Sequence, residues 1–308
     1  MDTFVDSALE ISNVDENELK LRNVIKKGVA ECDLAIIGLP FDGATFGRQG
    51  AKYGPKFLRE ALYNFNTYSY TFRIDLKDLV INDYGDLLIS NSDLNFSYSK
   101  IREAAIEAYK KAKMVAFLGG DHSITYATAS ALAELGSVSL IVMDAHHDVR
   151  RLKKNFSSSG TYLRTLIEEK KNIKNVFQLG IRDFYNSTSY VEYVEHSNVK
   201  YYTIEEIRNR SIEKVCEEII NSASQTDFTY MSLDMDVLDA CYSKGVNSLC
   251  VNGMEPKEII SLTRKLGRIK NMKGIDVVEI APLYENDKIS CHLGAYLILS
   301  AVSSHFSL

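Results

Sequence analysis

Short runs of apolar and often β-branched residues recur along the chain, and most of them end near Gly, Asp or Pro. Runs of this kind are typical of strands that are buried on both faces of a parallel sheet. Such strands need helices on both sides, so this pattern constrains the fold more than any other feature of the sequence. The runs cover residues 34–39, 79–81, 114–118, 138–143, 176–179, 201–203, 228–233 and 275–280.

Stretches with helical spacing lie between these runs. Clear examples are residues 100–113, 124–135, 212–222 and 255–266, the last with Pro256 near its start, where the missing N–H is not needed. Alternating strand and helix over the whole length predicts an α/β fold with a largely parallel sheet. We interpret residues 1–308 as one domain, in which residues 1–30 form an N-terminal arm or an added helix.

The composition excludes several classes of function. The chain has 308 residues and a net charge of -5, with no cluster of Lys and Arg that would indicate nucleic-acid binding. We find no signal peptide and no apolar stretch that approaches the length of a membrane span, so we expect a cytoplasmic protein that does not contact membranes. Of the five cysteines, expected to be free thiols, Cys241 and Cys250 lie near the predicted site without an assigned role.

Chemically reactive residues directly follow three of the predicted strands. In open parallel sheets, ligands bind at the carboxyl ends of the strands, so these segments are expected to meet. The first segment is GGDHS at residues 119–123, whose glycines allow a sharp turn and which places His122 at a strand end. Taken alone this signal is weak, because a single histidine is more often structural than a ligand.

The second segment is DAHHD at residues 144–148. In extended chain Asp144, His146 and Asp148 project to one side, whereas His147 points the other way and is expected to have a supporting role. Two carboxylates and an imidazole placed together are costly unless a cation compensates them. The alternative is a hydrogen-bonded capping cluster without a metal.

The third segment is SLDMDVLD at residues 232–239, in which Asp234 and Asp236 share a face. If this segment stood alone, Asp234 and Asp236 would be interpreted as turn-capping carboxylates. Asp239 is expected either to cap a turn or to hold a ligand histidine. Together the segments supply carboxylates and imidazoles without a thiolate, which favours Mn²⁺ over a structural Zn²⁺. Six such side chains can hold two ions roughly 3.5–4 Å apart, which activate water for hydrolysis. The predicted metal ligands are His122, Asp144, His146, Asp148, Asp234 and Asp236.

The three segments resemble the signatures of the ureohydrolase family, which includes arginases, agmatinases and formiminoglutamases. The resemblance extends upstream to residues 38–55 and downstream to GIDVVEIAP at residues 274–282, and it covers the chain from residue 33 onward. It implies a three-layer αβα fold with a mostly parallel eight-stranded sheet and a binuclear Mn²⁺ site. It also implies a homo-oligomer, either a trimer or a hexamer, that acts on a small-molecule substrate.

Residue by residue, the resemblance implies that Asp144 and Asp234 bind both ions. It further implies that Asp148 accepts a proton from the activated water and that Glu279 pairs with a cationic guanidine or amidine. The alternative for Glu279 is a salt bridge within the fold. The implied ligand sets are His122, Asp144, Asp148 and Asp234 for one ion, and Asp144, His146, Asp234 and Asp236 for the other.

Three residues depart from the arginase and agmatinase pattern and are the candidates for substrate binding. Ser159 stands in place of a histidine and cannot act as a cationic proton donor. Arg150 follows Asp148 by two residues, and Asn247 lies in a Gly-Val-Asn loop; both features resemble formiminoglutamases. An arginine forms a bidentate pair with a carboxylate such as those of formiminoglutamate. The alternative is that Arg150 is a surface residue beside Arg151.

The sequence therefore favours hydrolysis of formiminoglutamate to glutamate and formamide. An agmatinase or a guanidino-acid ureohydrolase, which would release urea, is the alternative within the same fold. An alternative from another functional class is that the chain is a non-catalytic, regulatory relative of these enzymes.

Overall fold

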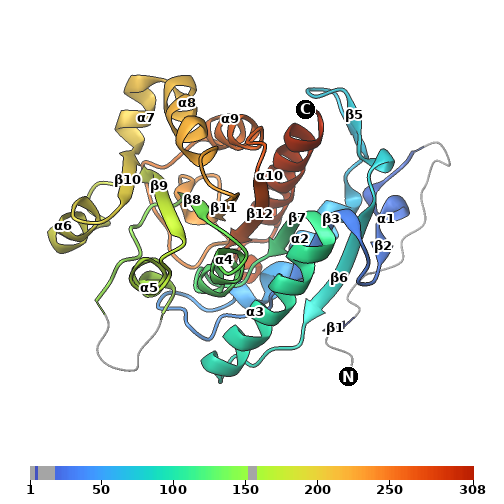
Figure 1. Cartoon of the computed structure of the whole chain (residues 1–308), viewed down its shortest axis with the longest axis horizontal. Coiled ribbons are helices and arrows are strands. Elements are labelled where there is room, and N and C mark those ends of the chain that lie inside the picture. Colours follow the sequence, from blue (N-terminus) through green and yellow to red (C-terminus); the bar gives the residue numbers. More distant parts are fainter. Residues whose placement is uncertain (1–3, 6–17, 152–157) are drawn as a thin grey trace.

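A parallel sheet forms the centre of the computed structural model, which describes residues 4–5, 18–151 and 158–308 (Figure 1). Each of its eight long strands overlaps one of the eight predicted runs, so the predicted parallel sheet is confirmed. These strands are β3 (Cys32–Gly38), β6 (Ile81–Leu87), β7 (Ala112–Leu118), β8 (Val138–Met143), β9 (Ile173–Ile181), β10 (Val199–Thr203), β11 (Phe228–Asp234) and β12 (Met272–Val278).

The strand order is β1-β6-β3-β7-β12-β11-β8-β9-β10, with β2 also paired to β6. The added strands β1 (Phe4–Val5) and β2 (Lys26–Lys27) have two residues each, and β1 is antiparallel to β6. Within the predicted N-terminal arm, residues 1–3 and 6–17 lie outside the described residues. The rest of the arm contains β2 and the one-turn helix α1 (Leu21–Val24).

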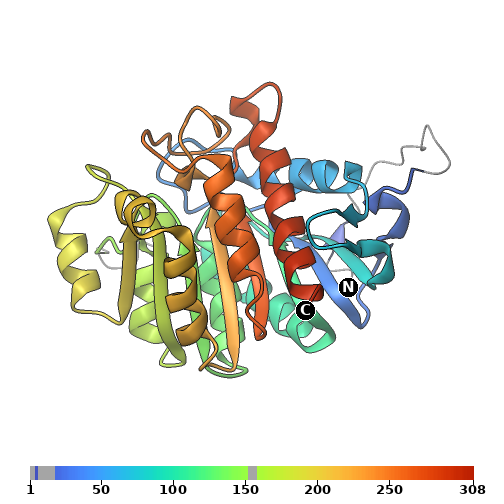
Figure 2. The same ribbon diagram turned by 90° about the horizontal axis from the view of Figure 1, so that it is seen from above.

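Alternate residues of the long strands enter two separate cores, which makes three layers. In β3, Leu34 and Ile36 join one core, while Ala35 and Ile37 join the other. Helices α8, α9 and α10 cover one face and α3, α4 and α5 the other, as Figures 1 and 2 show. The helix bounds are α2 (Gly54–Asn64), α3 (Leu94–Lys111), α4 (Ile124–Ala133), α5 (Tyr162–Glu169), α6 (Thr188–Glu195), α7 (Ile204–Arg210), α8 (Ile212–Ala223), α9 (Pro256–Leu266) and α10 (Ile289–Phe306).

Helix α10 corrects one expectation from the sequence. It has 18 residues with a mean hydropathy of 1.2, so by length and composition alone it could cross a membrane. The expectation that no apolar stretch approaches that length is therefore wrong. Within the fold, 61% of this stretch is buried, and the helix packs on α2, α9 and β12. We interpret its apolar character as that of a core helix covered by its neighbours.

A buried ion pair anchors α2 to β6, and its removal is expected to destabilise the fold. Arg59 is 2% exposed, and its Nε donates to Asp83 Oδ2 at 2.7 Å. Arg59→Met leaves Asp83 buried without its cation, so we expect the free energy of unfolding to fall by about 3–5 kcal/mol. Urea denaturation measures this change. The exposed Lys56 on the same helix is the control: K56M should stay within about 0.5 kcal/mol. A loss below about 1 kcal/mol for Arg59→Met would contradict this assignment.

Candidate metal centre

Four neighbouring strands bring the predicted site residues together. Strands β7, β12, β11 and β8 are adjacent in this order. His122 follows β7, Asp144 follows β8, Asp234 ends β11, and Glu279 follows β12. Because all four strands are parallel, residues distant in sequence meet at one edge of the sheet.

The first cluster surrounds the Nδ1 atom of His122. This atom lies 2.9 Å from Asp234 Oδ2, 3.1 Å from Asp144 Oδ2 and 3.3 Å from Asp148 Oδ2. In the described part of the chain, His122 Nδ1 and Asp144 Oδ2 are buried and make no hydrogen bond. Ligands held about 2.1 Å from a cation at right angles to each other are about 3 Å apart. The cluster therefore fits a shared cation.

The second cluster surrounds the Nδ1 atom of His146. This atom lies 3.0 Å from Asp236 Oδ2 and 3.4 Å from Asp144 Oδ1. Asp144 thus directs one carboxylate oxygen toward each histidine. Asp144, Asp234 and Asp236 form a further group whose ligand atoms lie within 4.8 Å of one another. The six residues therefore form two adjoining clusters that share the Asp144 carboxylate.

Burial and mutual proximity disfavour the charged forms of three carboxylates in this centre, whereas the neighbouring His122 and His146 lower the pKa of the shared Asp144 despite its burial. Burial raises the pKa of Asp148 to about 6, and the neighbouring Asp144 carboxylate also raises it. Burial likewise raises the pKa of Asp234 and Glu279 well above their usual range. A bound cation reverses this effect because it stabilises the ionised carboxylates. The six predicted ligands offer only oxygen and nitrogen atoms, which fits a hard divalent ion.

Three residues behind His122 fix its orientation, and sequence reasoning did not assign them a role. His122 Nε2 lies 3.0 Å from Ser232 Oγ and 2.9 Å from Tyr162 Oη, and Ser232 donates to Asp276 Oδ1 at 2.6 Å. Such contacts leave Nδ1 to face the cluster. Ser232 and Asp276 are polar residues inside apolar strands, and this pattern in the sequence could have indicated that they have a role. No pattern in the sequence indicates Tyr162.

His147 and Asp239 lie outside the clusters. His147 points away, as predicted: it is buried, and its Nδ1 lies 2.7 Å from Gln178 Oε1. Asp239 accepts hydrogen bonds from the backbone N–H groups of Cys241 and Gly253, so of its two predicted roles it has that of a turn cap.

The prediction that residues beyond Asp144 continue as an extended strand was wrong, but Asp148 and Arg150 nevertheless line the same cleft. Strand β8 ends at Met143, and residues 144–150 are not extended strand. Asp148 has φ +51°, a left-handed conformation that is costly for a residue with a side chain. The Arg150 N–H donates to the Gly160 carbonyl and so ties this loop to the Ser-Gly-Thr segment.

A cleft of 200 Å³ opens over the clusters, and all three candidates for substrate binding line it. Arg150 stands over the Phe46 ring, with its guanidinium carbon 5.3 Å from the ring centroid. Ser159 and Asn247 are 8% exposed, and His122 and Asp144 lie beneath the cleft. The cleft is lined by Phe46, Gly47, His146, Asp148, Arg150, Ser159, Gly160, Asp234, Asp236, Asn247, Ser248 and Glu279.

Glu279 lines this cleft and has one carboxylate oxygen without a hydrogen-bond partner in the part of the chain that the structure describes. Its Oε1 accepts from the His122 N–H at 2.7 Å, whereas Oε2 is buried and has no hydrogen-bond partner among the described residues. No Lys or Arg in the described ranges pairs with it, which argues against a salt bridge within the fold. Its φ of +63° is a second left-handed backbone at the site.

The two flagged cysteines differ. Cys250 is buried, its Sγ lies 3.8 Å from His146 Nε2, and it forms with His146 and Asp236 a group whose candidate ligand atoms lie within 4.8 Å of one another. Cys241 is exposed and lies in the turn that Asp239 caps.

The chain belongs to the arginase family, whose model matches residues 32–303. A formimidoylglutamase of Halalkalibacterium halodurans is 31% identical over 270 residues, which cover 86% of this chain and 85% of that protein. The mitochondrial agmatinase of Gallus gallus is 28% identical over 282 residues, covering 90% and 82%. The crystal structure of Bacillus subtilis formimidoylglutamase superposes with a TM-score of 0.90 at 28% identity and covers 97% of this chain and 95% of that one. The predicted family and fold class are thereby confirmed.

Proposed function

We propose that this chain is a metal-dependent hydrolase that converts formiminoglutamate to glutamate and formamide. The observation that carries the proposal is the convergence of six nitrogen and oxygen ligands beneath a cleft with Glu279 on its floor and Arg150 on its wall. The similarity to formimidoylglutamases supports this substrate.

The residues present fit two divalent cations, and the absence of a thiolate from the set favours Mn²⁺. His122, Asp144, Asp148 and Asp234 would hold one ion, and Asp144, His146, Asp234 and Asp236 the other. When bound, such ions lower the pKa of water and so supply a nucleophile near neutral pH.

Asp148 is the residue placed to move the proton. Its carboxylate lines the cleft, and its Oδ2 lies 3.3 Å from His122 Nδ1, among the proposed ligands and within reach of a water that they activate. Water adds to the formimidoyl carbon, and the bond from that carbon to the α-nitrogen of glutamate breaks. Asp148 takes a proton from the water and delivers it to the departing amine.

The charges of the cleft match the two ends of the substrate. The free Oε2 of Glu279 pairs with the cationic formimidoyl group, and Arg150 pairs with a carboxylate of the glutamate moiety. Ser159 and Asn247 supply neutral hydrogen-bonding groups between them.

Loss of the Arg150 guanidinium is expected to weaken substrate binding without affecting the metal. Arg150→Ala removes a charge-assisted pair, so KM for formiminoglutamate should rise about tenfold or more while metal content stays constant. Steady-state kinetics and elemental analysis measure the two quantities. The exposed neighbour Arg151 is the matched control, and R151A should leave KM near the original value. An unchanged KM for Arg150→Ala would contradict the assignment of Arg150 to substrate binding.

The second candidate is a ureohydrolase that acts on agmatine or a guanidino acid, as the similarity to an agmatinase suggests. Against agmatine, Arg150 would face the substrate's amine with a like charge. A turnover screen with Mn²⁺ across formiminoglutamate, agmatine, arginine and guanidinobutyrate separates these functions. We expect glutamate and formamide from the first compound and no urea from the others. Urea from agmatine would contradict the proposal, and turnover of none of them would favour a non-catalytic regulatory relative.

We further propose that the protein acts in the cytoplasm as a homo-oligomer, a trimer or a hexamer, with only small molecules as substrates. A solution mass equal to that of one chain, measured by light scattering, would contradict the oligomer.

A further inference from the structure

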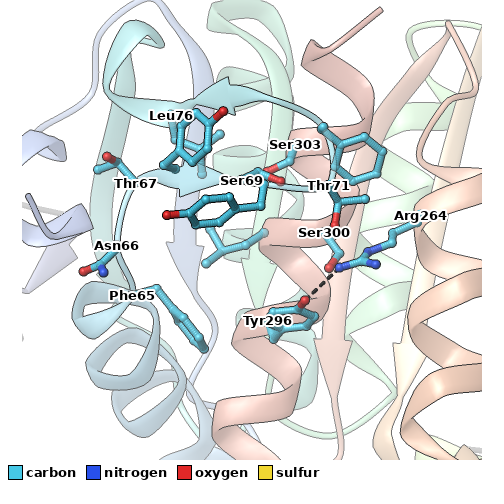
Figure 3. Close-up of a pocket in the computed structure, with 14 residues that line it drawn as sticks. Phe65, Asn66, Thr67, Ser69, Thr71, Leu76, Arg264, Tyr296, Ser300 and Ser303 are labelled. Carbon is cyan, nitrogen blue, oxygen red and sulfur yellow. Dashed lines mark hydrogen bonds between the residues drawn. The ribbon is translucent and has the colours of Figure 1, made fainter.

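A second cavity of 230 Å³ lies between a hairpin and the helices α9 and α10 (Figure 3). The hairpin consists of β4 (Tyr68–Ser69) and β5 (Ile74–Asp75). None of the residues that line this cavity lines the cleft over the metal centre. The cavity therefore needs an explanation of its own.

Aromatic side chains and hydroxyl groups line this hairpin cavity. The rings of Phe65 and Tyr296 have centroids 6.0 Å apart, and the rings of Tyr68 and Tyr70 are 5.0 Å apart and perpendicular. Aromatic walls favour a planar ring, and hydroxyls can both donate to and accept from polar atoms on the edge of such a ring. The hydroxyl groups belong to Thr67, Ser69, Thr71, Ser300 and Ser303.

One wall of the hairpin cavity carries the guanidinium of Arg264. Its Nη2 donates to Tyr296 Oη at 2.7 Å, the contact drawn in Figure 3, and its carbon lies 5.9 Å from the Phe72 ring centroid. Its Nε is buried and has no hydrogen-bond partner, and no carboxylate in the described ranges pairs with it. Because no described carboxylate neutralises its charge, this guanidinium can bind an anion through its terminal Nη groups.

A third, more open cavity of 460 Å³ continues from the hairpin cavity and adds positive charge. The two share Thr71, Phe72, Arg264 and Tyr296. Lys257 and Lys265 also line it, but they pair with Glu255 and Glu213. Arg268, which is exposed, lacks an ion pair in the part of the chain that the structure describes. In a chain of net charge -5, two cations without counter-charges beside an aromatic cavity mark an anion-binding position.

We propose that this pair of cavities binds a small ligand that joins a planar heteroaromatic ring to a phosphate group, the chemistry of a nucleotide. The ring lies in the hairpin cavity against the aromatic side chains that line it, among them Phe65 and Tyr296, and the phosphate lies at Arg264 and Arg268. Guanidinium groups hold phosphate by charge-assisted hydrogen bonds, and aromatic rings stack on bases of any sequence. This site is independent of the proposed hydrolase function.

Isothermal titration of the full chain with adenosine, guanosine, cytidine and uridine monophosphates tests the proposal. At least one should bind, and more tightly than its nucleoside or ribose phosphate alone. Arg264→Gln should weaken that binding about tenfold or more, because a charge-assisted hydrogen bond is lost. Arg268→Gln, an exposed change that spares folding, should weaken it in the same direction.

The control is K110Q, which removes an exposed cation on α3, outside both cavities, and should leave the affinity unchanged. Melting temperatures establish that each variant is folded. Failure of all four monophosphates to bind at millimolar concentration would overturn the proposal. Equal affinity in the original chain, Arg264→Gln and Arg268→Gln would overturn it as well.

Discussion

Asp144→Asn should abolish the binding of both cations, because this carboxylate directs one oxygen to each histidine of the centre. Asparagine keeps an oxygen that can accept from the His146 N–H, a hydrogen bond that Asp144 makes at 2.6 Å, so the local fold should survive. We expect Mn²⁺ content to fall below about one ion per chain. Turnover should drop about a thousandfold or more, since the ions supply several kcal/mol of stabilisation to the transition state.

Elemental analysis after Mn²⁺ incubation measures the metal content, and an assay of the same samples measures the turnover. The exposed Asp78 is the matched control, and D78N should keep both metal and activity. Full metal occupancy in Asp144→Asn would contradict the view that Asp144 joins the two clusters.

Glu279→Gln should separate metal binding from catalysis. Glutamine retains an oxygen that accepts from the His122 N–H, but it removes the negative charge that faces the cleft. Losing a buried charge pair costs about 3–5 kcal/mol, so kcat/KM should fall by at least about two orders of magnitude while Mn²⁺ content is unchanged.

The exposed Glu192 on α6 offers a matched control, E192Q, which should leave both kcat/KM and metal content as they were. If Glu279→Gln kept nearly full activity, Glu279 would not be the partner of the cationic end of the substrate. If it lost its metal, its role would be structural support of His122.

Much of the sheet could be predicted because buried parallel strands are short, apolar and bounded by turn residues. The run 138–143 became β8, whose residues are all buried. The predicted run 79–81 overlaps strand β6 only at its first residue. The polar residues Asn82, Asp83 and Asp86 interrupt the apolar pattern in the rest of the strand. Asp83 is buried there against Arg59, a tertiary contact that local patterns do not reveal.

The cluster of six side chains could be predicted because these residues follow the strands directly and stand in short motifs. The conformation of residues 144–150 could not, since a left-handed backbone at Asp148 depends on contacts with distant segments. Tyr162 was missed for the same reason: it reaches His122 from a helix 40 residues further along the chain. The hairpin cavity also required the fold, because residues 65–76 meet α9 and α10 only in three dimensions.

We propose that six side chains of one chain hold two divalent cations. Titration of the metal-free protein with Mn²⁺, followed by calorimetry and by electron paramagnetic resonance, tests it most directly. We expect two bound ions per chain, with a spectrum of two magnetically coupled Mn²⁺ ions at the short separation that a shared carboxylate imposes. Binding of fewer than about one ion per chain, or of isolated ions without coupling, would contradict it.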